Sequence, residues 1–217
     1  MTSRTSSNIV ILHGPAGSGK GTVAKELVKL DYYLIGAGDE IRDYIKSANI
    51  DDDKAIRMQN KLDQGLHVDT TDLLSIVEQK LLDLKGFKIL GDGLVREKDQ
   101  ALWLHAYATL YQESVTFINL TIEYDVIAQR LKNRYFIPSN PFPYSSYQAA
   151  FVDCKNGEVP YTRSDDFSEA IKSRFDQHTN KLSGIKEVCR SSKYINFYDI
   201  NANQSPDNVL NDIKFYI

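Results

Sequence analysis

Residues 9–22 constrain the fold more than any other stretch of this chain, and they read Ile-Val-Ile-Leu-His-Gly-Pro-Ala-Gly-Ser-Gly-Lys-Gly-Thr. The apolar run from Ile9 to Leu12 is typical of a buried strand. A glycine-rich turn follows over 14–21, and residues 23–30 carry apolar side chains on one side, as an amphipathic helix does. A strand, a tight glycine loop and a helix start in this order predict a cradle for phosphate groups.

The residue types of this loop suit a polyphosphate. Glycines let the backbone approach closely, and the helix N-terminus directs N–H donors and a partial positive charge at the ligand. Lys20 would add a mobile charge, and the Thr22 hydroxyl would lie near a magnesium ion. A glycine turn beside a surface lysine is the alternative interpretation, and the strand and helix on either side argue against it.

The composition is that of an ordinary globular protein. The 217 residues suit one α/β domain with an insertion, and the net charge of −3 gives no reason to expect a nucleic acid or an anionic membrane as partner. No apolar run approaches the roughly 20 residues of a membrane span, and residues 1–8 do not resemble a signal peptide. Cys154 and Cys189 form no disulfide framework and no metal quartet, so a cytoplasmic location is expected.

Apolar patterning predicts strands that alternate with helices along the chain. The expected strands are 9–12, 32–35, 87–90, 115–120 and 194–198, and the expected helices are 23–30, 39–47, 51–64, 70–85, 97–111, 122–133, 165–188 and 206–215. Ser205 is the expected cap of the last helix, with Pro206 at its first position. This alternation predicts a three-layer α/β fold with a parallel sheet covered on both faces and a site at the carboxyl ends of the strands.

Four further polar stretches lie just after strands or at helix ends. They are Gly38-Asp39-Glu40-Ile41-Arg42, then Gly91 to Arg96 with Gln100, then Arg130 with Arg134, and finally Arg163-Ser164-Asp165-Asp166 with Arg174. Each one alone is explained equally well by solvated arginines or by turns. Together they suit phosphoryl transfer, which needs alignment and charge neutralisation, because the arginine fork binds phosphate oxygens in pairs. Asp92 is placed to hold magnesium through its waters.

These stretches resemble motifs of the adenylate kinase family of nucleoside monophosphate kinases. The loop has the family pattern Gly-x-x-Gly-x-Gly-Lys-Gly-Thr over 14–22. The family's Thr-Gly-Asp-x-x-Arg stretch is matched from Gly38 to Arg42. Its Asp-Gly-Phe-Pro-Arg-Thr-x-x-Gln stretch is matched at Asp92, Gly93, Arg96 and Gln100. Its remaining arginine motifs are matched at Arg130, Arg134, Arg163, Asp165, Asp166 and Arg174, so the similarity runs from Ile9 to about Leu182.

The resemblance implies a fold and an activity. The fold would be the P-loop nucleoside-triphosphate-binding fold, with 1–217 as a single kinase domain, a helical monophosphate-binding subdomain over 38–68 and a mobile lid over 135–163. The reaction would move the γ-phosphoryl group of Mg-ATP to AMP, as one step of nucleotide biosynthesis. The enzyme would be a monomer without zinc.

The resemblance also implies a role for each matched residue. The catalytic residues would be Lys20, Arg96, Arg134, Arg163 and Arg174. ATP would be bound by Gly17, Ser18, Gly19, Lys20, Gly21, Thr22 and Arg130. The monophosphate would be bound by Ala37, Arg42, Val68, Gly93, Arg96 and Gln100, with 65–68 as the wall of its pocket.

Three departures from the family pattern leave questions open. Ala37 stands where the family has threonine, and Leu94-Val95 stand where it has Phe-Pro, so a pyrimidine (CMP or UMP) kinase is an alternative. A catalytically weak nucleotide-binding regulator is another. Arg134 and Arg163 are 29 residues apart, which indicates the long lid, yet Cys154 is the single cysteine in it. One thiolate cannot build a zinc site, so aromatic side chains are expected to hold the lid.

Overall fold

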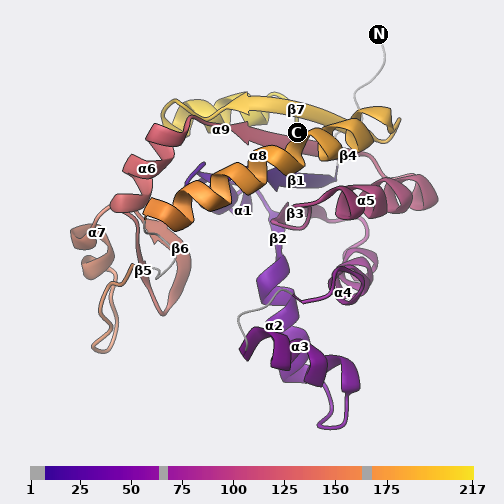
Figure 1. Cartoon of the computed structure of the whole chain (residues 1–217), viewed down its shortest axis with the longest axis horizontal. Coiled ribbons are helices and arrows are strands. Elements are labelled where there is room, and N and C mark those ends of the chain that lie inside the picture. The colour runs from indigo at the N-terminus through magenta and orange to yellow at the C-terminus, as the bar shows by residue number, and fades with distance from the viewer. Residues whose placement is uncertain (1–7, 64–67, 163–167) are drawn as a thin grey trace.

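The computed structural model describes residues 8–63, 68–162 and 168–217, and the described residues form two sheets (Figure 1). The main sheet is fully parallel, with the order β2-β3-β1-β4-β7. Its strands are β1 (Ile9–His13), β2 (Tyr32–Gly36), β3 (Lys88–Asp92), β4 (Val115–Thr121) and β7 (Ile195–Asn201). The second sheet is an antiparallel pair made of β5 (Tyr135–Ile137) and β6 (Asn140–Tyr144).

Helices cover both faces of the main sheet. They are α1 (Lys20–Val28), α2 (Ala37–Ser47), α3 (Asp53–Asp63), α4 (Thr70–Asp83), α5 (Lys98–Tyr111), α6 (Tyr124–Lys132), α7 (Tyr147–Val152), α8 (Ser168–Ser191) and α9 (Pro206–Lys214). Ile9 and Ile11 of β1 face a cluster with α4, α5 and α8, while Val10 and Leu12 face a cluster with α1 and α9. This alternation along one buried strand confirms the three-layer α/β fold.

The observed element limits differ from the predicted ones by a few residues, for local backbone reasons. Helix α1 begins at Lys20 rather than residue 23, because Gly19, with φ +100°, is its left-handed N-cap. It ends at Val28, since the chain turns at Asp31 with φ +66°. Strand β3 runs on to Asp92, so this aspartate is the last residue of the strand rather than part of the turn after it.

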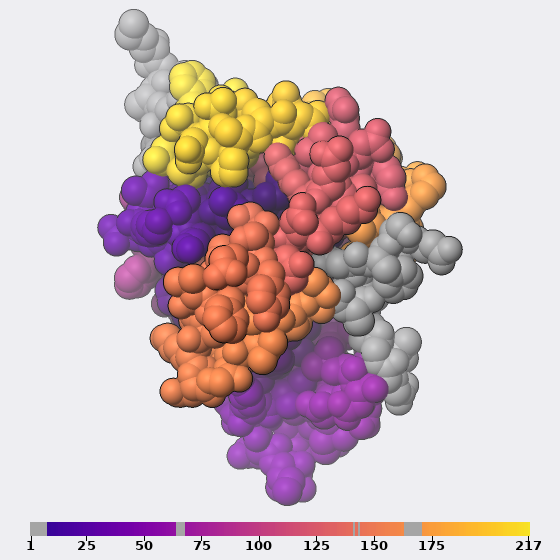
Figure 2. Space-filling model, turned by 90° about the vertical axis from the view of Figure 1, so that its left-hand side faces the viewer, coloured from indigo at the N-terminus to yellow at the C-terminus, as the bar shows by residue number. Residues whose placement is uncertain are grey.

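Residues 135–162, the described part of the segment expected as a lid, form a small lobe. The hairpin of β5 and β6 is followed by α7, a helix that the aromatic and proline-rich sequence did not predict. Ser146 caps α7 by accepting a hydrogen bond from the backbone N–H of Ala149 at 3.1 Å. Phe142 of β6 packs against the core cluster that includes α1, so the lobe lies beside α1. Figure 2 shows it in orange, between the yellow C-terminal elements and the purple α2–α3 region.

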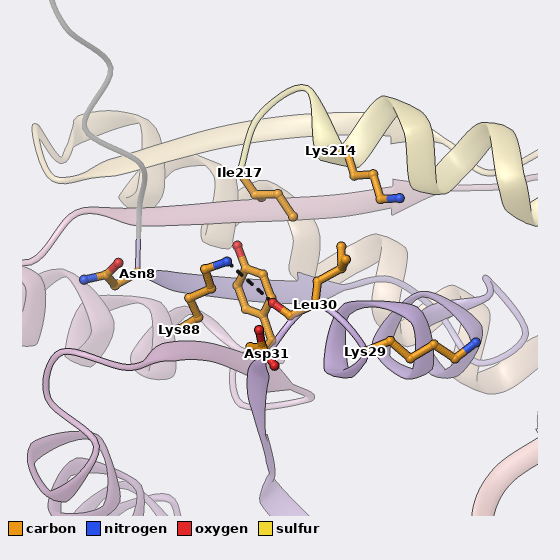
Figure 3. A pocket seen from close by; sticks show the side chains of 8 residues that line it. Asn8, Lys29, Leu30, Asp31, Lys88, Lys214 and Ile217 are labelled. Carbon is orange, nitrogen blue, oxygen red and sulfur yellow. Dashed lines mark hydrogen bonds between the residues drawn. The ribbon is translucent and has the colours of Figure 1, made fainter.

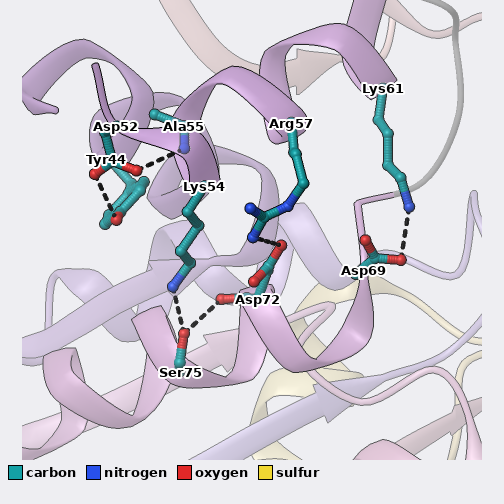
Figure 4. Close-up of polar contacts among 9 residues, drawn as sticks. All are labelled: Tyr44, Asp52, Lys54, Ala55, Arg57, Lys61, Asp69, Asp72 and Ser75. Carbon is teal, nitrogen blue, oxygen red and sulfur yellow. Dashed lines mark hydrogen bonds and ion pairs between the residues drawn. The ribbon is translucent and has the colours of Figure 1, made fainter. Parts of the chain in front are cut away.

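Polar contacts fasten α3 along α4 (Figure 4). They pair Lys54 with Ser75 at 2.5 Å, Arg57 with Asp72 at 3.5 Å and Lys61 with Asp69 at 2.6 Å. Met58 of α3 is 1% exposed and lies in the main core cluster with Leu73 and Val77 of α4, so apolar packing also holds α3 in place. Helices α2 and α3 project from the sheet (Figure 1).

No helix in the described ranges is both long enough and apolar enough to cross a lipid bilayer.

Candidate active site

The glycine loop lies at the carboxyl end of β1, the central strand of the main sheet. Gly19 has φ +100°, and a Cβ added there would meet no described heavy atom within 4 Å. The N-cap residue of α1 makes no side-chain hydrogen bond to the first-turn N–H groups, so these donors are left for a ligand. Ser18 Oγ is buried and has no hydrogen-bond partner among the described residues. Open space lined by unpaired donors is the arrangement that an anion requires.

Lys20 lies across this loop. Its Nζ donates to the carbonyl oxygens of Gly14 at 2.6 Å and Pro15 at 3.0 Å. Burial lowers the pKa of Lys20 to about 8, the charge of Asp92 opposes this shift, and the charges of Arg96 and Arg134 add to it. The charges that act on the loop lysine therefore come from two of the predicted motifs, one with Asp92 and Arg96 and the other with Arg134.

The strand register explains why Asp92 reaches the loop. Asp92 is paired with Leu12 of β1 on one side and with Gly36 of β2 on the other. It therefore lies beside the start of the glycine loop, as the sequence predicted, although its strand runs further than the predicted end at residue 90. The magnesium role assigned to it stays a prediction.

Two histidines that the sequence analysis did not single out lie under the loop. His13, the last residue of β1, stacks on His178 of α8 with ring centroids 4.5 Å apart and 27° between the planes. His13 Nδ1 is 2.9 Å from Asn119 Oδ1, and Asn119 Nδ2 donates to Asp199 Oδ1 at 2.7 Å. Since the amide nitrogen of Asn119 is used on Asp199, its oxygen accepts from His13, and His13 carries its hydrogen on Nδ1.

The predicted arginines occupy different surroundings. Arg130 donates from Nη2 to the carbonyl oxygens of Ala202 at 2.9 Å and Gln204 at 3.1 Å, so it joins α6 to the connection between β7 and α9. The guanidinium of Arg134 lies 5.1 Å from the centroid of the Phe136 ring. Arg174 lies on α8, half-buried. Arg163 lies outside the described residues, as do Asp165 and Asp166.

The predicted monophosphate residues gather around the ends of β2 and β3. Arg96 Nε donates to Gly93 O at 3.2 Å, and its charge reaches both Lys20 and His13. Gln100 is buried, and its Oε1 accepts the backbone N–H of Arg96 at 2.6 Å. This local bond was not foreseen, and it leaves the amide nitrogen of Gln100 as the atom that could meet a base.

Three other members of this set are held in different ways. Arg42 is exposed and bonded to Asp39 at 2.5 Å. Ala37 is buried at the start of α2, and Val68 packs against the main core. The rest of the predicted pocket wall, 65–67, lies outside the described residues.

The chain matches a protein family and known proteins over most of its length. The family model described as adenylate kinase matches residues 12–193. The chain belongs to the adenylate kinase family. It is similar to the adenylate kinase of Pelagibacter ubique, with 28% identity over 94% of this chain and 97% of that protein. It is also similar to those of Chlamydia pneumoniae (29%, over 83% and 84%) and Rickettsia prowazekii (27%, over 95% and 97%). This membership makes the chain a phosphotransferase.

Side-chain contacts hold together the hairpin of β5 and β6 and helix α7. Tyr144 Oη donates to Asp153 Oδ2 at 2.9 Å, and Asn140 Nδ2 donates to Tyr144 Oη at 2.8 Å. Tyr147 packs edge-on against Tyr135 and stacks on Phe151. The sequence predicted the aromatic contacts and missed the hydrogen bonds. Within 8–63, 68–162 and 168–217, no group of three or more His, Cys, Asp or Glu side chains is placed to hold a metal ion.

A hollow of about 450 Å³ lies far from the adenylate kinase motifs, at the amino ends of the strands (Figure 3). It is lined by Asn8, Lys29, Leu30, Asp31, Tyr32, Lys88, Lys214 and Ile217. Lys29 is paired with Glu26 at 2.8 Å, and Lys88 reaches the carbonyl oxygen of Leu30 at 3.5 Å. Ligands of parallel α/β sheets bind at the carboxyl ends, so the loop and not this hollow is the candidate active site.

We expect the histidine pair to make the protein sensitive to acid. Burial lowers the pKa of His13 to about 4 and that of His178 to about 3, and Lys20 adds to both shifts. Between pH 6.5 and about 4 these two rings are protonated in the unfolded chain but stay neutral in the folded chain. The free energy of unfolding therefore falls as the pH falls. A histidine whose pKa is lowered as far as that of His13 reduces the free energy of unfolding by on the order of 2 kcal/mol when the pH falls from 7 to 5.

Urea unfolding of wild type and His178→Phe at pH 7 and pH 5 measures this effect. The variant keeps a flat ring against His13 but lacks one of the two titrating groups, so it should lose less stability over this interval. The same loss in both proteins would contradict the assignment.

Proposed function

We propose that this chain transfers the γ-phosphoryl group of Mg-ATP to AMP and so converts ATP and AMP into two ADP. The observation that carries the proposal is the loop at the start of α1, where Lys20 interacts electrostatically with Asp92, Arg96 and Arg134. Three cationic groups and one carboxylate around open N–H donors suit a highly charged phosphoryl group in transit.

In this reaction an α-phosphate oxygen of the acceptor attacks the γ-phosphorus in line. The bond from that phosphorus to the β–γ bridging oxygen breaks, and ADP leaves. The attacking oxygen is already anionic at neutral pH, so no general base is needed. Lys20, Arg134, Arg163 and Arg174 would neutralise charge on the moving group, and Arg96 with Arg42 would hold the acceptor phosphate.

Magnesium would be held near Asp92, through its waters, and near the Thr22 hydroxyl. Both are hard oxygen donors, as Mg²⁺ requires, and the charge on Asp92 is close enough to Lys20 to raise its pKa. When bound, the ion would neutralise charge on the phosphates of ATP.

The remaining expected roles belong to the same proposal. Arg130, fixed by two carbonyl oxygens of the 202–204 connection, would lie over the ATP base. The lid over 135–163 would close and exclude water, which prevents hydrolysis from competing with transfer. We also propose a monomer that contains no zinc and works in the cytoplasm, and the free thiols of Cys154 and Cys189 are compatible with that location.

The bond from Gln100 to Arg96 sharpens the expected base preference. With Oε1 occupied by the Arg96 N–H, the amide nitrogen can only donate. Adenine and cytosine present a ring nitrogen that accepts. Guanine and uracil present a ring N–H at that position, and their neighbouring carbonyl oxygen accepts the bond only if the base shifts relative to the amide. A donor facing an N–H leaves both groups unpaired, at about 1–3 kcal/mol each.

We therefore expect AMP as the best acceptor, with dAMP or CMP behind it and GMP and UMP poor. Coupled detection of ADP with each monophosphate gives the order as kcat/KM. Gln100→Leu should reduce the differences in kcat/KM between the monophosphates. Gln100→Glu is the sharper variant, since it keeps an oxygen for the Arg96 N–H but removes the NH₂ donors, and it should also flatten the order. A higher kcat/KM for UMP or CMP than for AMP would favour the pyrimidine kinase.

A further inference from the structure

The stack of His13 on His178 has no part in the proposed reaction, yet it joins the glycine loop to the helix that carries Arg174. His13 directly precedes Gly14, the first residue of the loop. His178 lies on α8, which otherwise packs on α5, α6 and β7. The ring centroids are 4.5 Å apart and nearly parallel, so the rings touch face to face.

The stack is one link of a closed circuit of contacts. From His13 the circuit passes to Asn119 of β4 at 2.9 Å and on to Asp199 of β7 at 2.7 Å. It then returns to α8, because Lys186 Nζ lies 2.9 Å from Asp199 Oδ2. His178 and Lys186 are thus two fixed points on α8, about 12 Å apart at 1.5 Å per residue. A helix held at two such points, one on β1 and one on β7, can neither slide nor rotate without breaking a contact.

Arg174 lies one turn before the first of these points. Residues at positions i and i+4 share one side of a helix, so Arg174 and His178 are neighbours along α8. Ile171 and Phe175 pack against Ile127 and Leu131 of α6 in a small apolar cluster, to which Ala16 of the loop also belongs. The turn that carries Arg174 is therefore bounded by apolar contacts on one side and by the histidine stack on the other.

The stack persists near neutral pH. Burial keeps the pKa of both rings low, and the charged groups that face the pair, Lys20 on α1 and Arg96 after β3, lower the pKa of His13 further. Asn119 from β4 favours protonation of His13 but is outweighed. A hollow of about 140 Å³ beside His178, lined by Pro15 and Phe175 among others, leaves room for α8 to shift if the ring is removed.

We propose that His13 and His178 are positioning residues, which fix α8 relative to the glycine loop and thereby place Arg174 for phosphoryl transfer. The inference rests on the proposed function for the role of Arg174. The positioning of α8 itself does not depend on that function.

Steady-state kinetics of His178→Ala tests the role. We expect kcat to fall by about 10- to 100-fold, since a displacement near 1 Å costs up to that much, while KM for both substrates changes less than about threefold. His178→Phe keeps a flat ring and should recover kcat to within about threefold of wild type. Gln177→Ala, at an exposed neighbouring position, is the control and should match wild type.

A double-mutant cycle with Arg174→Ala separates positioning from general damage. If His178 acts through Arg174, the double variant should be no slower than Arg174→Ala alone, because the misplaced group is already absent. If the reduction in kcat of the double variant equals the product of the reductions in the two single variants, the proposal is overturned. Should His178→Ala fold poorly, the double variant Lys186→Gln, Arg190→Gln opens the circuit from its other end, since both residues of α8 pair with Asp199, and it should show the same non-additivity.

Hydrogen exchange of the α8 backbone amides measures how firmly this helix is held and does not depend on enzymatic activity. Exchange over 171–182 should be faster in His178→Ala than in wild type and Gln177→Ala. Unchanged exchange would overturn the inference even in an active enzyme. Faster exchange in a chain whose wild type transfers no phosphoryl group would refute the proposed function and leave the positioning of α8 standing.

Discussion

Lys20→Met is expected to lower turnover by about three orders of magnitude or more, the scale typical of cationic groups that stabilise a transferring phosphoryl group. Lys20 is half-buried and bonded to two loop carbonyls, and desolvation lowers its pKa to about 8. Two anionic oxygens of a phosphate would be better partners than carbonyls, because hydrogen bonds between charged groups are stronger. Coupled detection of ADP at saturating ATP and AMP measures the loss.

Lys25→Met is the matched control, because Lys25 lies on the same helix but is exposed. It should keep the turnover of wild type. Lys20→Met with turnover within about tenfold of wild type would count against phosphoryl transfer at this loop, provided that its circular dichroism spectrum shows a folded protein.

A bisubstrate mimic that joins two adenosines through five phosphates should bind far more tightly than ADP, by a factor of about 10² to 10⁴. Such a ligand fills the triphosphate and monophosphate sites together, so the second half binds without the entropic cost of bringing in another molecule. Isothermal titration calorimetry gives both affinities.

The length of the phosphate bridge provides the control for this experiment. Two adenosines joined through three phosphates should bind no better than ADP, because a bridge that cannot span both sites gives no gain. Equal affinity for ADP and for the five-phosphate mimic would exclude two adjoining nucleotide sites.

Local signals in the sequence located most elements of the fold. The apolar run Ile9–Leu12 predicted β1, and Ser205 with Pro206 predicted the start of α9, where Ser205 Oγ accepts from Asn208 N at 3.3 Å. The strand order could not be read in the same way, because uniformly apolar strands carry no mark of their neighbours. Only the observed register shows that β1 lies between β3 and β4.

The candidate site was foreseen where a motif carries its own geometry and missed where it depends on distant partners. Lys20 and Asp92 were found because glycine spacing and a strand end determine their place. The partners of Arg130 are backbone carbonyls of Ala202 and Gln204, which no side-chain pattern reveals. His13 is a polar residue at the end of the apolar run Ile9–Leu12, and this could have marked it as a site residue. Nothing in the sequence indicated that His178 lies next to it.

The position of β1 at the centre of the sheet has a consequence for how the protein is made. Strand β1, which carries the loop, is made before both of its neighbours, residues 88–92 and 115–121, and the Asp199 that supports His13 through Asn119 comes later still, on an edge strand. One edge of β1 therefore stays unpaired until β3 has been made, and its other edge stays unpaired until β4 has been made. The support of His13 is completed last, because the bond from Asn119 to Asp199 forms only after β7 has been made.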